Sequence, residues 1–215
     1  LLSAPREVLF GESLVYWGYT NEIIKENILR SGQLGLWDNQ VGLGYSLLGH
    51  QGSQFYPPVW LSFFFSDQII GIRFLALFHL ILGGLACYYL LRVLRLNSFF
   101  SFFGGLLYIL NTYVQSIVVN GFFAEIYNLP WMPLSIAFLW QALFNKKPLF
   151  AVLSGVAFSM QIFAMTQYSF LFNGILLGML ISFHFAYQLV TKKRGILKTT
   201  CEAATIGFIL LATTV

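Results

Sequence analysis

The chain has 215 residues, of which 58% are hydrophobic and only 9% are charged, and its formal net charge is +4. A soluble domain carries about 25% charged residues, so this composition excludes an ordinary soluble protein and indicates an integral membrane protein. Its organisation is therefore measured by the apolar segments of about 20 residues that could each cross a bilayer.

The first predicted element is an amphipathic helix over residues 12–30. Its sequence, ESLVYWGYTNEIIKENILR, places apolar side chains at helical spacing, among them Trp17, Ile24 and Ile28, and turns its charged residues to other faces. Such a helix is predicted to lie in the membrane interface. Gly32 follows its last turn, where a glycine commonly ends a helix.

A stretch rich in glycine and aromatic residues precedes the first long apolar segment. It reads SGQLGLWDNQVGLGYSLLGHQGSQFYPP over residues 31–58. Its glycines permit close backbone approach, and its aromatic rings suit the membrane surface. A re-entrant loop that closes over an amphiphilic ligand would have this composition, and so would a purely structural interfacial loop. Asp38, His50 and Tyr56 are its candidate substrate contacts, although Asp38 could instead form an Asx-turn with Asn39.

Six apolar segments follow, at residues 69–94, 98–118, 127–145, 149–166, 169–190 and 199–215. All are predicted to be helices, because each backbone N–H and C=O in lipid must be satisfied within its own segment. The fold class is therefore all-α, a polytopic transmembrane helical bundle of about six spans after an extracytoplasmic N-terminal loop. Residues 1–66 form the predicted loop region and residues 67–215 the transmembrane region. The sequence shows no signal peptide and stops within an apolar run, so we expect it to be a piece of a longer protein.

Basic residues divide the connections between these segments into two sides. Eight of the twelve cations fall in alternate connections, namely Arg92, Arg95, Lys146, Lys147, Lys192, Lys193, Arg194 and Lys198. The positive-inside rule assigns those connections to the cytoplasm, which places the N-terminal loop outside. Seven of the eight acids then lie on the outer side, and only Glu202 lies near the inner face.

Two of the outer acids are candidates for catalysis. Glu125 lies among aromatic residues and is followed by Pro130 and Pro133, which are predicted to open or kink the start of the third segment. An acid held at membrane depth by a broken helix is costly unless it has a function, but Glu125 could also be a solvated residue of a short loop. Glu12 is either a second functional acid or the N-terminal cap of the amphipathic helix.

Three further candidates, Arg73, His79 and His184, lie within the apolar segments. Arg73 could contact a substrate, or it could snorkel outward or pair with Asp67. His79 and His184 are single histidines on different segments, and such residues are usually hydrogen-bonded packing groups. The alternative is that they ligate a metal or a chlorophyll-like pigment.

Several classes of function have no support in the sequence. The absence of HExxH, P-loop, GxSxG and GxGxxG motifs leaves zinc hydrolysis, nucleotide-driven work and serine hydrolysis without a basis. Cys87 and Cys201 lie in apolar runs without paired spacing, which predicts packing residues rather than a disulfide or a metal site. Nothing predicts a nucleic-acid partner.

The order of the motifs resembles the YfhO-like bacterial membrane proteins of the type C glycosyltransferase (GT-C) superfamily. The resemblance rests on GESLVYWGY, then ILRSGQLGLWDNQVGLGYSLLGHQGSQFYPP, then a long span, a basic turn and NGFFAEIYNLPWMPLSIAF. It covers about residues 10 to 140. The family pattern has an acid near the start of the first outer loop, which matches Glu12, and an acid before W-x-P-L, which matches Glu125. Many relatives have Asp where Glu12 stands.

The resemblance implies an enzyme that takes a sugar from a polyprenyl-phosphate donor at the extracytoplasmic face and transfers it to a lipid, glycan or protein. Glu12 would act as general base or orient the acceptor, with Glu125 as the second acid. Arg73 could pair with the donor phosphate, and a divalent cation there is left open. The alternative is a non-enzymatic membrane subunit or a lipid or polymer transporter of a larger complex. Either would lie in the inner membrane of a bacterial cell envelope.

Overall fold

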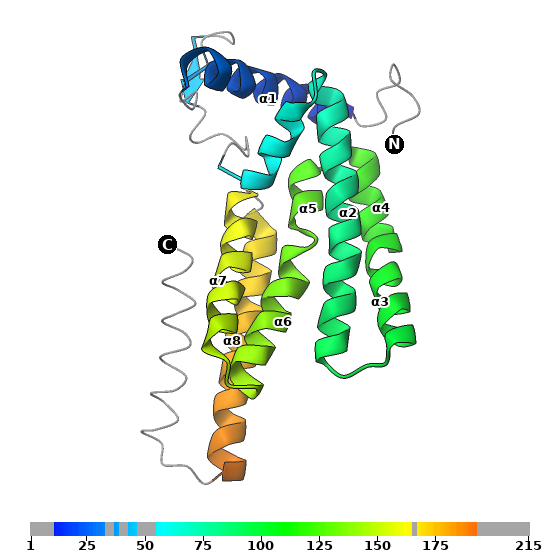
Figure 1. Ribbon diagram of the computed structural model, residues 1–215, viewed down its shortest axis with the longest axis vertical. Coiled ribbons are helices and arrows are strands. Elements are labelled where there is room, and N and C mark those ends of the chain that lie inside the picture. Colours follow the sequence, from blue (N-terminus) through cyan, green and yellow to red (C-terminus); the bar gives the residue numbers. More distant parts are fainter. Residues whose placement is uncertain (1–10, 33–36, 39–42, 47–54, 165–166, 193–215) are drawn as a thin grey trace.

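The computed structural model describes residues 11–32, 37–38, 43–46, 55–164 and 167–192 of the chain, and helices dominate these residues (Figure 1). In chain order the elements are α1 (Gly11–Ser31), β1 (Trp37–Asp38), β2 (Tyr45–Ser46), η1 (Pro57–Phe64), α2 (Gln68–Val93), α3 (Ser98–Leu110), α4 (Thr112–Asn120), α5 (Phe123–Asn128), α6 (Trp131–Phe144), α7 (Pro148–Phe163) and α8 (Gln167–Lys192). β1 and β2 form a short antiparallel pair in which Trp37 faces Ser46 and Asp38 faces Tyr45. The predicted all-helical class is therefore confirmed.

Three helical segments of the described residues are long and apolar enough to cross a membrane. They are Gln68–Val93, Ser98–Asn120 and Tyr168–Val190, while Pro148–Phe163 is a shorter apolar helix. The predicted third segment is divided between α5 and α6, and the predicted segment at 199–215 lies outside the described residues. Three candidate spans are thus found, and the count of six stays a prediction.

Short polar side chains set the starts of the spanning helices. The Asp67 carboxylate accepts a hydrogen bond from the backbone N–H of Ile69 at the start of α2. Asn97 caps α3 through the N–H of Phe100 in the same way. Asn111 accepts from the N–H of Val114 and so starts α4 within the segment that was predicted as one span. Each cap satisfies a donor that the helix itself cannot satisfy.

Helix α2 is the centre of the bundle, and α1, η1, α3, α5 and α6 pack against it. Two glycine contacts allow this close packing. A Cβ on Gly105 of α3 would lie 2.7 Å from the carbonyl oxygen of Gly84 in α2. A Cβ on Gly71 of α2 would lie 2.7 Å from the carbonyl oxygen of Ser62 in η1. Small residues at such positions let membrane helices approach until their backbones touch.

Helix α1 lies across one end of the bundle instead of running along it (Figure 1). Ile24 on its inner face is fully buried, whereas Glu22 and Glu26 are exposed. The ammonium group of Lys25 donates to the carbonyl oxygen of Phe65 at 2.6 Å, which ties α1 to the segment before α2. The predicted amphipathic helix at 12–30 is present, and its place in the membrane interface stays a prediction.

Candidate functional site

The candidate site lies around the break between α5 and α6. The prediction that prolines interrupt the helix here is confirmed. Pro130 and Pro133 have no N–H, so the carbonyl groups of Ile126 and Leu129 lose their usual helical donors. The N–H of Leu129 turns to the Ile126 oxygen at 3.2 Å. The Tyr108 hydroxyl, from α3, donates to the Leu129 oxygen at 2.8 Å. The break is therefore satisfied by protein groups, as an irregular backbone at membrane depth requires.

Tyr56 is the centre of a buried polar network beside this break. Its hydroxyl accepts a hydrogen bond from the Trp131 indole N–H at 2.6 Å, lies 2.6 Å from Nε2 of His79 and lies 3.2 Å from the Tyr127 carbonyl oxygen. Nδ1 of His79 lies 2.7 Å from the Leu75 carbonyl oxygen, which can only accept. Nδ1 therefore carries the proton, and the Tyr56 hydroxyl donates to the free Nε2.

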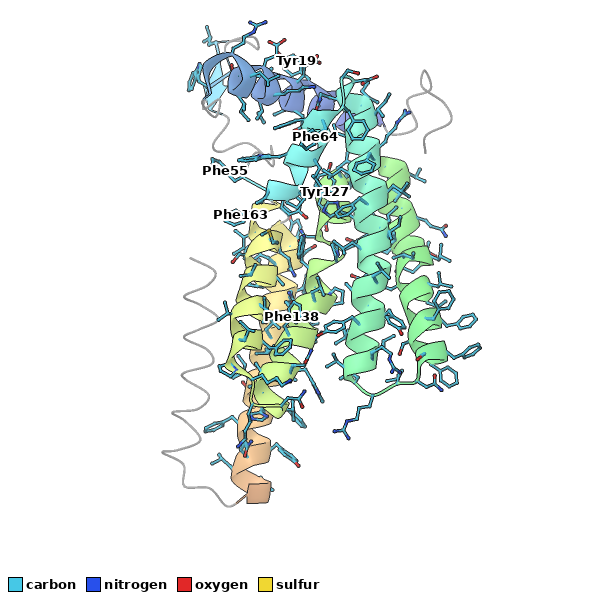
Figure 2. All side chains as sticks on the ribbon, viewed as in Figure 1. Tyr19, Phe55, Phe64, Tyr127, Phe138 and Phe163 are labelled. Carbon is cyan, nitrogen blue, oxygen red and sulfur yellow. The ribbon has the colours of Figure 1, made fainter. Side chains whose placement is uncertain are left out.

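The rings of this network also pack closely. Tyr56 stacks on Tyr127 with 5.8 Å between ring centroids, and His79 lies 4.9 Å from the same ring. Figure 2 shows Tyr127 where η1, α2 and α5 meet. Tyr56 is fully buried, and burial raises its pKa, so the hydroxyl keeps its proton. Tyr56 was predicted as a substrate contact, and the structure gives its hydroxyl a set of internal partners.

Neither histidine in the described residues belongs to a group of metal ligands. His79 is held by Tyr56 and Leu75 as described above. This agrees with the prediction that it is a hydrogen-bonded packing residue. His184 lies edge-on to Phe144 with 4.8 Å between ring centroids, and its Nε2 lies 3.2 Å from the Gln188 amide nitrogen. Among the described residues there is no group of three or more His, Cys, Asp or Glu that could hold a metal, so no step is assigned to a cation.

Glu125 lies in the first turn of α5, one turn before the break. Its carboxylate is half-buried and accepts a hydrogen bond from the Ser169 hydroxyl of α8 at 2.7 Å. Tyr113 of α4 lies close to the same carboxylate. The buried side chains of Phe123 and Ile126 anchor α5 on either side. Glu125 thus accepts a hydrogen bond from another helix instead of facing only solvent.

Arg73 lies in the second turn of α2, and only 3% of its surface is exposed. Its side chain does not snorkel into solvent. The predicted partner, Asp67, uses its carboxylate to cap α2. Among the described residues, the ion pair that is found joins Arg30 to Glu26. The guanidinium of Arg73 therefore lies inside the bundle.

The other three predicted site residues are only partly described. Glu12 lies in the first turn of α1, a position that suits both the capping and the functional interpretation. Asp38 belongs to β1, and His50 lies outside the described residues. Helix α1 packs on α2 and contacts α4, the helix that carries Tyr113. The helix of Glu12 therefore reaches an element close to Glu125.

Two buried amides near the break were not predicted from the sequence. Asn128 is 4% exposed and Gln161 is fully buried, and within the described residues neither side chain has a hydrogen-bond partner for its oxygen or its nitrogen. They belong to α5 and α7, which contact each other. In the sequence, each of these residues is visible only as a single amide side chain among apolar neighbours. Unsatisfied buried amides are costly, which makes this region a candidate for bound water or a polar ligand group.

The site thus combines a half-buried acid and a tyrosine-centred network beside one broken helix, while Arg73 is buried elsewhere along α2. Comparison of the chain with protein-family models, with curated proteins and with solved structures found no match.

Proposed function

We propose that the chain is part of a GT-C-like membrane glycosyltransferase that uses a polyprenyl-phosphate sugar at the extracytoplasmic face. The observation that carries the proposal is Glu125, a half-buried carboxylate beside a broken helix that accepts a hydrogen bond from Ser169 of α8. Acidic side chains at such positions in membrane proteins have a high energetic cost and usually have a function. The motif order that resembles the YfhO-like proteins supports the same reading.

The chemistry requires one base and one group that stabilises the leaving phosphate. An acceptor hydroxyl attacks the anomeric carbon, the bond from that carbon to the phosphate oxygen breaks, and polyprenyl phosphate leaves. The hydroxyl proton passes to a carboxylate, for which Glu12 and Glu125 are the candidates. The guanidinium of Arg73 would balance the phosphate charge from inside the bundle, since charge-assisted pairs of this kind are strong.

Transfer of a labelled sugar from polyprenyl phosphate by membranes that contain the full-length protein tests this proposal. Glu12→Gln and Glu125→Gln should each lower the rate by about 10²-fold, the lower end of what general acid–base catalysis contributes. Glu22→Gln is the matched control, because Glu22 is an exposed acid on α1 and should transfer sugar at the wild-type rate.

The outcomes separate the proposed enzyme from its alternative. Full transfer by both variants would refute the roles of the two acids. If the wild-type protein binds the lipid-linked sugar but transfers nothing, the protein is a non-enzymatic subunit or a transporter. A loss confined to Glu125→Gln would leave Glu12 as a helix cap.

The proposed topology has its own test. Single cysteines at Lys147 and Arg95 should resist a membrane-impermeant maleimide in intact cells and react once the membrane is opened, because the positive-inside rule places both in the cytoplasm. A cysteine at Glu22 should react in intact cells, since that side chain is exposed on α1. The unsubstituted protein measures the background from Cys87 and Cys201. Labelling of all three positions from the same side would contradict the topology and move the site away from the outer face.

A further inference from the structure

A groove lies between α2 and α3, on the other side of α2 from the α6, α7 and α8 group. Its volume of about 470 Å³ falls within the range of roughly 300–1,000 Å³ that ligand pockets occupy. The lining is almost wholly apolar, with side chains or backbone from Ile81, Gly84, Leu85, Tyr88, Phe102 and Leu106.

The shape of the groove follows from the glycine contact between the two helices. Gly84 and Gly105 meet backbone to backbone, so neither residue places a side chain in the groove. Ile81, Leu85 and Phe102 form walls that are each more than half exposed. The groove is therefore open along its length to the surroundings of the bundle, which suits a linear apolar chain better than a compact ligand.

One end of the groove is basic. Arg92 follows Tyr88 by one helical turn on the same face of α2, and Arg95 lies in the short connection to α3; both side chains are exposed. A guanidinium N–H of Arg92 donates to the Leu96 carbonyl oxygen at 2.7 Å, which holds that charge at the connection.

No acid offsets these charges in the part of the chain that the structure describes. The described acids lie in α1, in β1, directly before α2 and in α5. The connection between α6 and α7, at the same end of the bundle in Figure 1, adds Lys146 and Lys147. Among the described residues, the charged side chains of these two connections are thus all positive.

We propose that the groove between α2 and α3 holds one acyl chain of an anionic phospholipid whose head group lies against Arg92 and Arg95. The apolar floor and walls receive the chain, and the two arginines select a negative head group. The predicted topology makes this a lipid of the cytoplasmic leaflet. The site is separate from the break at Pro130, so the proposal does not depend on the proposed function.

Photocrosslinking of the full-length protein in phosphatidylcholine vesicles tests this site. The probe is a phosphatidylglycerol with a diazirine at the end of one acyl chain, and mass spectrometry locates the labelled residues. Labels should fall within residues 81–88 and 98–109, and unlabelled phosphatidylglycerol should compete while phosphatidylcholine should not. Arg92→Gln and Arg95→Gln should each weaken the competition by about fivefold, the equivalent of one basic residue near an anionic surface.

A pair of tryptophan variants separates the groove from the general lipid-facing surface. Leu106→Trp fills the groove and should abolish its labelling, whereas Leu107→Trp changes a neighbouring residue that is 70% exposed and should leave labelling intact. Equal labelling of the two variants, equal competition by phosphatidylcholine, or an absence of labels from these residues would each overturn the proposal. The last result would also be expected if another protein segment fills the groove.

Discussion

Replacing Tyr56 with phenylalanine will destabilise the protein by between about 2 and 6 kcal/mol, because at least two buried groups lose their partner and each unsatisfied group costs about 1–3 kcal/mol. The Trp131 indole N–H and Nε2 of His79 both depend on the Tyr56 hydroxyl at 2.6 Å. The ring itself remains, so packing against Tyr127 is preserved. The decrease in the free energy of unfolding therefore reports the contribution of the hydroxyl group alone. Equilibrium unfolding in mixed micelles, with a rising fraction of denaturing detergent, gives the free energy of unfolding.

Two further measurements show whether the hydroxyl works through this network. Tyr168→Phe is the control, because Tyr168 is 71% exposed on α8 and loss of its hydroxyl should change the free energy of unfolding little. A double-mutant cycle that combines Tyr56→Phe with Trp131→Phe should give a coupling energy of about 0.5–3 kcal/mol. Additive effects, or equal losses in Tyr56→Phe and Tyr168→Phe, would contradict the network.

The second large effect is expected at Gly105. Alanine there should destabilise the protein by about 1–3 kcal/mol despite the better helix propensity of alanine, because its Cβ would collide with backbone. The collision is with the Gly84 carbonyl oxygen at 2.7 Å, and a backbone atom cannot move aside as a side chain can. α2 and α3 would have to separate. The same detergent titration measures the change.

Gly178→Ala is the matched control for this substitution. Gly178 also lies in a helix, and a Cβ there meets nothing within 4 Å. It should leave stability unchanged or raise it by up to about 1 kcal/mol through helix propensity. If Gly105→Ala and Gly178→Ala behaved alike, the close contact of α2 with α3 would be wrong.

Local features of the sequence predicted the helices well. Length and apolarity predicted α2 and α8 to within a few residues, and the prolines predicted the break between α5 and α6. The segment at 98–118 was predicted as one span and is found as the candidate span Ser98–Asn120, but Asn111 starts a new helix, α4, within it. A side chain that captures a backbone N–H outweighs the apolar pattern at that position.

The site was less predictable because its contacts join distant parts of the chain. Tyr56 lies 23 residues from His79 and 75 from Trp131, so no local pattern could pair them. Glu125 was identified from its own surroundings, but its partner Ser169 lies 44 residues away on α8. The burial of Arg73 likewise depends on tertiary packing against α2, which periodicity does not specify.

The lengths of α6 and α7 have a consequence for the bilayer around the protein. These helices have 14 and 16 residues, which at 1.5 Å per residue gives about 21 and 24 Å, less than the roughly 30 Å of hydrocarbon. Such hydrophobic mismatch thins the adjacent lipid unless other elements extend the apolar surface. The 26-residue helix α8 packs against both α6 and α7 and extends the apolar surface on its own side only. The membrane should therefore be thinner beside α6 and α7 than beside α2, so that lipid head groups lie closer in depth to the ends of these two short helices.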